Sequence, residues 1–418
     1  MICTPGQARE LFVPCFQLAP QGIQEISMPH ALTGIKVIDV AINYAGPGSS
    51  TYLVDQGADV IKVERRIVGD TSRRSGNTPF LKLNSYAFMA LNRGKRSITL
   101  DITKPQGQEI LRALARDTDV LVENFRPGVM ERLSLGYDAL SALNPRLIYG
   151  SLTAFGAKGP YANRAGFDRL AQGLAGAMYK RDAEGRPLPT GVWIADWGAP
   201  MLMAFGIMLA LFARERTGRG QRVESSLMQA AIAMQFSQLT VVEDDPAPPR
   251  EENPAGYNSY RCSDGVFLNI GVYMPHQFKA LCRALDLPHL ADDPRLTDPL
   301  LRHELNAEVE PIVAALLATQ PARVWEDILV EADVPCAPIV ERARVPHEEQ
   351  VLANEMMVPI EHPVVGRTHI VGTPVRLSET PSVELKSAPT LGQHTDEILE
   401  ELGYSPEHIA ELREAEVI

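Results

Sequence analysis

A single carboxylate, Asp196, is the leading candidate for chemistry in this chain of 418 residues. It follows the apolar segment Gly191–Ala195, which is typical of a strand, and it precedes an apolar run that predicts a buried helix as far as Ala213. An aspartate at such a junction can simply cap the helix, because Asp is a favoured N-cap residue. Its position alone therefore leaves a structural and a functional interpretation open.

A second candidate is a cluster of basic residues in a chain whose net charge is -12. Between Asp59 and Arg96 only three acids oppose nine basic residues, which are Lys62, Arg65, Arg66, Arg73, Arg74, Lys82, Arg93, Lys95 and Arg96. Surface charge alone seldom marks a site, but several of these residues flank predicted strand ends and so favour a ligand that carries phosphate. The negative net charge argues against general nucleic-acid binding.

The known phosphate-binding motifs fit this chain poorly. The turn at Gly46-Pro-Gly48 lacks the third glycine of a dinucleotide fingerprint, and no P-loop pattern is present. Glu64 ends the second predicted strand, where an acid would bind a ribose hydroxyl. The adjacent Arg65 and Arg66 suit a phosphate better.

The elements that would position these residues alternate between strands and helices. Strands are predicted near 35–40, 59–64, 97–101, 119–123 and 147–151, with helices at 46–56 and 105–116. This alternation predicts an α/β fold with a parallel, Rossmann-like sheet and helices on its faces. Ligands of such sheets bind beyond the carboxyl ends of the strands, where Asn43 and Glu123–Phe125 lie.

The length predicts two or three domains. The predicted segments are an N-terminal arm 1–30, a large α/β domain 31–216, a linker 217–251, a smaller α+β domain 252–330, a return linker 331–395 and C-terminal helices 396–418 that join the large domain. The return linker is too long for a loop within a compact domain.

The five cysteines are odd in number and form no CxxC pair. This predicts reduced thiols in a cytoplasmic protein, with no disulfide framework and no metal site. The run Ala199–Ala213 is too short, and too interrupted by Pro and Gly, to predict a membrane span. The first 28 residues lack the pattern of a signal peptide.

Several ordered motifs together resemble a known family. They are Ala58–Arg65, Gly69-Asp70, Asn92–Ser97, Glu123–Gly128, Asn144–Ile148, Gly166–Asp168, Thr217–Gln221 and Gly392–Glu397. They resemble the class III CoA-transferases, or CaiB/BaiF family, which include formyl-CoA and carnitine CoA-transferases and the related α-methylacyl-CoA racemases. The resemblance covers roughly residues 31–418.

The resemblance implies that Asp196 is the nucleophile of a CoA-transferase. Its carboxylate would attack an acyl-CoA thioester and then carry CoA as an aspartyl-CoA thioester, which splits one difficult exchange into covalent steps. The following helix N-terminus would keep Asp196 ionised. Backbone N–H groups near Gly198 would stabilise an oxyanion. Asp168 and Tyr44 would support the reaction centre.

The resemblance also implies the contacts to CoA. The residues expected to bind it are Arg65, Leu100, Asn124, Phe125, Arg132 and Asn43. A lysine that is usual in the family is replaced by Thr103, with Lys104 next. CoA and acyl-CoA enter as substrates, and no permanently bound cofactor is expected.

Two departures from the family pattern bear on function. The related racemases use a histidine where this chain has Phe167, and the chain has no histidine between His30 and His276. Because phenylalanine cannot exchange protons, a two-base racemisation would lack one base. The loop Asn253–Ser259 has one glycine where the formyl-CoA enzyme has several, and Tyr44 replaces a glutamine. Oxalate and formate are therefore poor candidates, whereas a dicarboxylate such as succinate fits.

The leading hypothesis is a CoA-transferase that moves CoA from an acyl-CoA to a small carboxylic acid. One alternative is an α-methylacyl-CoA racemase or epimerase, and another is a non-catalytic CoA-binding protein. The family resemblance further implies an interlocked homodimer, with which the long return segment agrees. Neither nucleic acid nor a membrane is an expected partner.

Overall fold

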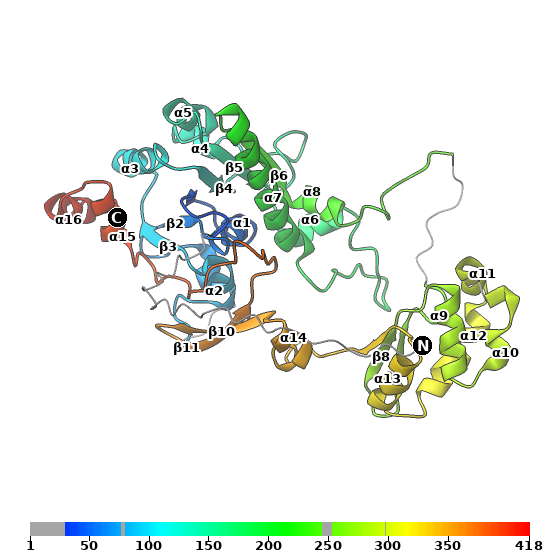
Figure 1. Cartoon of the computed structure of the whole chain (residues 1–418). Coiled ribbons are helices and arrows are strands. Elements are labelled where there is room, and N and C mark those ends of the chain that lie inside the picture. Colours follow the sequence, from blue (N-terminus) through cyan, green and yellow to red (C-terminus); the bar gives the residue numbers. More distant parts are fainter. Residues whose placement is uncertain (1–29, 77–79, 245–252, 297) are drawn as a thin grey trace, which may run out of the picture.

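The structure, a computed structural model, describes residues 30–76, 80–244, 253–296 and 298–418. Its centre is a six-stranded sheet in the order β3-β2-β1-β4-β5-β6 (Figure 1), and every neighbouring pair is parallel. The strands are β1 (Lys36–Asp39), β2 (Asp59–Glu64), β3 (Arg96–Thr99), β4 (Val120–Glu123), β5 (Ile148–Thr153) and β6 (Arg222–Ser226). The strand order reverses between β1 and β4, and such a switch point opens a crevice beyond the strand ends.

Helices cover both faces of this sheet. The helices of this part are α1 (Ala45–Val54), α2 (Tyr86–Asn92), α3 (Pro105–Ala115), α4 (Val129–Arg132), α5 (Tyr137–Leu143), α6 (Asp168–Leu174), α7 (Ile194–Thr217) and α8 (Leu227–Ala233), with a 3₁₀ turn η1 (Thr71–Arg74). Alternate strand residues divide into two buried clusters. Val37 and Val122 pack towards α1 and α7, whereas Ile38 and Leu121 pack with α3 and the C-terminal helices.

The C-terminal helices α15 (Thr395–Glu401) and α16 (Pro406–Glu414) complete the large domain. Ile398, Leu399 and Ile409 are buried in the same cluster as Ile38. Residues 396–418 were expected to join the large domain, and this packing agrees with that expectation.

A smaller domain has its own sheet and its own core. Its strands are β7 (Ser259–Arg261), β8 (Phe267–Ile270) and β9 (Cys336–Pro338), and its helices are α9 (Pro275–Ala284), α10 (Pro288–Ala291), α11 (Pro299–Glu304), α12 (Asn306–Leu317) and α13 (Ala322–Glu331), with a 3₁₀ turn η2 (Pro294–Leu296). Figure 1 shows this domain at one end of the molecule, away from the six-stranded sheet.

The chain returns through a 3₁₀ turn η3 (Val345–His347), α14 (Glu349–Ala353) and an antiparallel hairpin of β10 (Met357–His362) and β11 (Gly366–Val371). Two expected linkers therefore need correction. Residues 217–251 include β6 and α8, and residues 331–395 include β9 and the hairpin. These strands escape sequence analysis because they are short and polar or rich in proline. The arm 1–29 and residues 245–252 lie outside the described residues.

Helix α7 is the longest helix that the described residues form, and it is strongly apolar. Its 24 residues include a window of mean hydropathy 1.6, so by length and composition alone it could cross a membrane. Half of that window is buried inside the protein. Met203 and Ile207 pack in the core beneath the sheet, which is the usual place of an apolar helix in an α/β domain.

Two glycines let α1 lie close to its neighbours. A Cβ on Gly46 would stand 2.3 Å from the Ala41 Cβ atom, and one on Gly48 would stand 2.9 Å from the Pro200 ring of α7. Such distances are far inside normal van der Waals contact. The Gly46-Pro-Gly48 segment thus serves close packing beside the switch point.

Candidate active site

Asp196 lies in the first turn of α7, and its neighbour Asp168 holds that turn in place. The Asp168 carboxylate accepts hydrogen bonds from the backbone N–H groups of Ala195 (2.8 Å) and Asp196 (3.1 Å). Asp168 itself is only 4% exposed. The cap of α7 is therefore supplied by Asp168, 28 residues earlier in the chain, and Asp196 does not act as the cap. The segment before Asp196 is not a strand, because α7 already begins at Ile194.

This arrangement overturns the expectation that the helix N-terminus keeps Asp196 ionised. Burial, followed by repulsion from the Asp168 carboxylate, raises the pKa of Asp196 to about 7. The first amides of α7, which would favour a charged carboxylate, are bonded to Asp168 instead. Asp196 is thus a poorly solvated and reactive carboxylate that loses its proton near neutral pH.

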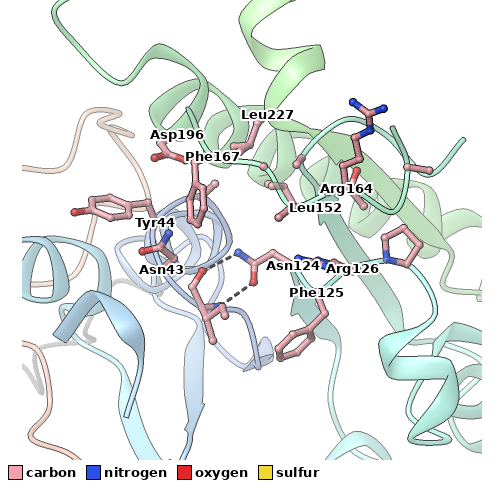
Figure 2. Close-up of a pocket in the computed structure, with 18 residues that line it drawn as sticks. Asn43, Tyr44, Asn124, Phe125, Arg126, Leu152, Arg164, Phe167, Asp196 and Leu227 are labelled. Atoms are coloured by element: carbon pink, nitrogen blue, oxygen red, sulfur yellow. Dashed lines mark hydrogen bonds between the residues drawn. The ribbon is translucent and has the colours of Figure 1, made fainter. Parts of the chain in front are cut away.

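A cavity of about 230 Å³ opens beside Asp196 (Figure 2). It lies over the carboxyl ends of β1, β4 and β5. Its wall comprises Ile42, Asn43, Tyr44, Ala45, Asn124, Phe125, Arg126, Pro127, Leu152, Thr153, Ala154, Ala162, Arg164, Ala165, Gly166, Phe167, Asp196 and Leu227. Of the residues expected at the site, Asp196, Asn43, Tyr44, Asn124 and Phe125 therefore meet in one place.

Aromatic side chains surround the start of α7. The Tyr44 ring meets the rings of Trp193 and Trp197 edge to face, with centroids 5.1 and 6.0 Å apart. Its hydroxyl group lies 2.6 Å from the Ser75 Oγ atom, at hydrogen-bond distance. These contacts fix Tyr44, and they help to exclude water from Asp196.

No histidine lines this cavity among the described residues. Phe167 occupies the wall where a racemase of the family would place its base, and its side chain is 62% exposed. Figure 2 shows Phe167 close to Asp196 at the same end of the cavity. Phe167 therefore cannot serve as the second base of a two-base racemisation.

A second and larger cavity, of about 800 Å³, adjoins the first. The two cavities share Ile42, Asn124, Phe125 and Arg126 in their walls. The larger cavity also brings Arg65 and Leu100 together at the ends of β2 and β3. We call it the nucleotide cavity, because its size and its arginines suit a phosphate-bearing ligand. Four of the six residues expected to bind CoA line it, and Asn43 lies in the smaller cavity.

Arg132 and Gly198 stand apart from both cavities. Arg132 is the exposed last residue of α4 and does not belong to the described wall of either cavity. Gly198 lies in the second turn of α7, where a Cβ would stand 3.0 Å from the Met234 methyl group. Gly198 thus serves helix packing, and the structure gives no support for an oxyanion site at its backbone.

Thr103 and Lys104 lie where the family resemblance implies a lysine contact to CoA. The Thr103 hydroxyl donates to the Asp101 carboxylate at 2.6 Å, and Thr103 lines the nucleotide cavity. The Lys104 ammonium donates at 2.8 Å to the backbone carbonyl of Ala415. Lys104 therefore ties the end of α16 to the start of α3, and it lines neither cavity.

Most of the basic cluster serves internal ion pairs. Lys62, Arg73 and Lys95 are almost completely buried and pair with Asp39, Glu64 and Asp70. Arg93 pairs with Asp55, and Arg96 pairs with Asp59, Glu397 and Glu401. The Arg66 side chain donates to the backbone carbonyls of Ile418 and Glu416. Within the described residues, Arg65 is the exposed member of the cluster that faces the nucleotide cavity.

Sequence reasoning missed three contributors to this site. Arg126 lines both cavities, and its place directly after Asn124-Phe125 in the family motif was an available signal. Trp193 packs on Tyr44 and could have been found by its nearness to Asp196. Gln172 is fully buried, donates to Asp168 and accepts from the Thr190 N–H group at 3.1 Å. No sequence signal distinguishes Gln172 from an ordinary core residue.

The parallel sheet and the two adjoining cavities together indicate an enzyme with a long substrate. Such a site holds a long phosphate-bearing substrate across the carboxyl end of a parallel sheet and brings its far end to a carboxylate. In the comparison with known families, residues 32–395 match CoA-transferase family III. The chain belongs to this family, and it is therefore a CoA-transferase whose substrates include CoA thioesters.

Individual relatives agree with this assignment. A succinyl-CoA:glutarate CoA-transferase of Mus musculus is 34% identical over 381 residues, covering 89% of this chain and 86% of the relative. A formyl-CoA:oxalate CoA-transferase of Rhodopseudomonas palustris is 33% identical over 418 residues, covering 93% and 97%. The crystal structure of a CAIB/BAIF family protein from Brucella suis has a TM-score of 0.77 and 32% identity, covering 90% of this chain and all of the other.

Proposed function

We propose that this CoA-transferase moves CoA from an acyl-CoA to a small carboxylic acid through an aspartyl-CoA intermediate on Asp196. The single observation that carries this proposal is the place of Asp196. Asp196 lies in the wall of a small cavity that shares four wall residues with the nucleotide cavity. A CoA thioester that lies across Asn124 and Phe125 would bring its carbonyl carbon to Asp196.

The proposed reaction has four covalent steps. An oxygen of the Asp196 carboxylate attacks the thioester carbonyl, the C–S bond breaks, and CoA leaves as a thiolate from a mixed anhydride. The thiolate attacks the Asp196 carbonyl and releases the donor acid as a carboxylate. The acceptor carboxylate then attacks the aspartyl thioester and again releases thiolate. Attack of this thiolate on the acceptor carbonyl frees Asp196 and yields the new thioester.

The protein contributes positioning and exclusion of water. Asp168 fixes the first turn of α7 and so fixes the Asp196 backbone. The rings of Tyr44, Trp193 and Trp197 cover the same turn. A dry setting protects an anhydride and a thioester from hydrolysis and makes the carboxylate a stronger nucleophile.

We infer further that the acceptor is a small dicarboxylate. The relatives described above are named for glutarate and oxalate, which both carry two carboxylates. The wall of the cavity beside Asp196 includes Arg126 among apolar residues, whereas the Arg164 guanidinium stacks on the Tyr161 ring and points away from Asp196 (Figure 2). An arginine can bind the carboxylate that does not react. A panel of acyl-CoA donors against mono- and dicarboxylic acids, analysed by mass spectrometry, would identify the pair.

The rival isomerase and the non-catalytic alternative are tested by one experiment. The enzyme is incubated with succinyl-CoA without an acceptor, digested and analysed by mass spectrometry. We expect the peptide that contains Asp196 to carry CoA, and hydroxylamine to convert it to the hydroxamate. Asp196→Asn is the matched control and should remain unlabelled. An unlabelled Asp196 in an active enzyme, or transfer activity that survives in Asp196→Asn, would refute the mechanism.

We also propose that the protein is a homodimer, interlocked as in its family. An apolar strip on α7 supports this proposal. Its residues are Met201, Phe205, Met208, Leu209 and Phe212, which are between 41% and 62% exposed. So large an exposed apolar surface usually marks an interface. Light scattering should give twice the chain mass. Phe205→Glu should lower that mass, whereas Leu143→Glu, on α5, should not.

A cytoplasmic location is the last part of this proposal. Cys262 and Cys282 are buried free thiols, and Cys336 is free as well. Free thiols suit a reducing compartment. Fractionation of cells that express the tagged protein tests this expectation.

A further inference from the structure

Six charged side chains form a buried network beneath the turn that joins β1 to α1. The three acids are Asp39, Glu64 and Asp70, the three cations are Lys62, Arg73 and Lys95, and none is more than 3% exposed. The Lys62 ammonium lies 3.0 Å from Asp70 and 3.4 Å from Asp39. Lys95 lies 2.9 Å from Asp39, and Arg73 lies 2.6 Å from Glu64. The charges balance.

The network bonds directly to the backbone of the turn. The Asp39 carboxylate accepts from the Ala41 N–H group at 3.0 Å, and the Lys62 ammonium donates to the Ala41 carbonyl. The Asp70 carboxylate accepts from the Asn43 N–H group at 2.9 Å. Three members of the network thus fix residues 41–43 from one side.

The Asn124 side chain holds the same turn from the other side. Its amide accepts from the Ile42 N–H group at 2.8 Å and donates to the Ile42 carbonyl at 2.7 Å, as the dashed lines in Figure 2 show. Asn124 lines both cavities. The turn is therefore clamped between Asn124 and the buried charges.

The backbone of this turn has an uncommon conformation. Asn43 has a φ of 71°, in the left-handed region that residues other than glycine seldom adopt, although asparagine tolerates it better than most. Asn43 and Tyr44 both line the cavity of Asp196, and Tyr44 packs on Trp193 at the start of α7. A small shift of the turn would therefore move the wall that faces the nucleophile.

The network also reaches the loop that presents Arg65. The Glu64 carboxylate accepts from the Asp70 N–H group at 3.0 Å and from the Ser97 hydroxyl at 2.8 Å. Glu64 and Asp70 thus fix both ends of the 64–70 loop. Stability alone is a weak reason to bury so many charges, because apolar side chains often stabilise a core as well as ion pairs do.

From these contacts we propose that Lys62 and Asp70 are positioning residues for the chemical step. They hold the turn 41–44 so that the cavity wall stays in place beside Asp196. Lys62 lines neither cavity, and Asp70 is only 1% exposed where it lies in the wall of the nucleotide cavity. This proposal rests on the proposed function of Asp196. It predicts that loss of the pair slows the reaction at Asp196 while CoA still binds.

The test compares the double variant Lys62→Met/Asp70→Asn with Asp55→Asn in the full-length enzyme. The double variant removes both charges, so neither is left buried alone. Asp55 is the matched control because it is 1% exposed and pairs with Arg93 at 2.5 and 2.9 Å, but it does not touch the turn. Asp70→Asn alone is the second variant, in case the double variant fails to fold.

Two readouts decide the proposal. The rate of Asp196 labelling by succinyl-CoA in a single turnover should fall at least about tenfold in the double variant, with the dissociation constant of CoA changed by less than about twofold. Hydrogen exchange in a peptide that spans residues 40–46 should accelerate in the same variant. Asp55→Asn should change neither readout by more than about twofold.

The outcomes that overturn the proposal are specific. Equal loss of labelling rate in Asp55→Asn and the double variant would assign a merely structural role to the network. Unchanged exchange at residues 40–46, or a parallel loss of CoA binding, would do the same. Failure of the proposed function can be distinguished from failure of this proposal, because the wild-type protein itself would then form no adduct at Asp196. The hydrogen-exchange readout would still show whether the network holds the turn.

Discussion

The raised pKa of Asp196 makes the transfer rate depend on pH in a defined way. Because the nucleophile must be ionised, kcat/KM should rise with pH through about 7. An acid of this pKa is about 9% ionised at pH 6 and about 91% ionised at pH 8, so the rate should rise roughly tenfold over this interval. An aspartate in water would be almost fully ionised throughout.

Replacing Asp168 by asparagine should shift this profile to lower pH. The side-chain carbonyl of the introduced asparagine can still accept from the amides of Ala195 and Asp196, but the charge that repels Asp196 is gone. The pKa of Asp196 rises from 3.8 to about 7, with burial as the larger cause, so removing the Asp168 charge should reverse only part of this rise. At pH 6 the variant should then work at a larger fraction of its own plateau rate than the wild type, for which that fraction is about a tenth.

The assay is kcat/KM for succinyl-CoA from pH 5 to 9, with each protein normalised to its own plateau. Asp101→Asn is the control, because Asp101 lines the nucleotide cavity and its loss changes the charge equally. That variant should keep the wild-type midpoint. A midpoint in Asp168→Asn that stays in place or moves to higher pH would refute the electrostatic reasoning.

Three further predictions concern stability, binding and selectivity. Folding raises the pKa of Asp196 from 3.8 to about 7, so ionisation of Asp196 lowers the free energy of unfolding as the pH rises through this interval. Asp196→Asn should therefore be more stable than the wild type at pH 8 by roughly 2 to 4 kcal/mol. In thermal or urea unfolding this gain should vanish below about pH 4. Arg65→Gln should raise the KM for acyl-CoA about tenfold, as expected for a lost charge-assisted hydrogen bond, and kcat should stay nearly constant in steady-state assays. Because Phe167 supplies no base, the wild-type enzyme should exchange no α-proton of 2-methylacyl-CoA in heavy water without an acceptor acid, and rapid exchange detected by NMR would restore the racemase hypothesis.

Sequence patterns predicted the interior strands well, because these have strong hydrophobic signals. The predicted strand 59–64 coincides with β2, whereas β6 was missed. The β6 sequence Arg-Val-Glu-Ser-Ser is polar because the strand lies at the sheet edge and is solvated on one side. A polar edge strand is hard to distinguish from a loop in a single sequence.

Most of the residues predicted at the site lie around the two cavities, but their environment was not predictable. Family motifs located Asp196, Asn124 and Arg65, but they gave no sign that Asp168 caps α7. The pairing of the charged residues could not be predicted either. A count of basic residues suggested an open cationic surface, yet Lys95 is bonded to Asp39, 56 positions away in sequence. Pairing over such distances depends on the fold and is invisible to local composition.

The position of α15 and α16 has a consequence for biosynthesis. These helices fill the face of the sheet next to Ile38 and Ile98, whose strands leave the ribosome roughly 300 residues earlier. Until then that face has exposed apolar side chains, while the small domain, whose core is its own, can already have folded. The large domain should therefore complete its folding only after translation is nearly finished. Chaperones that cover nascent apolar surface should associate with the growing chain until α15 and α16 have been synthesised.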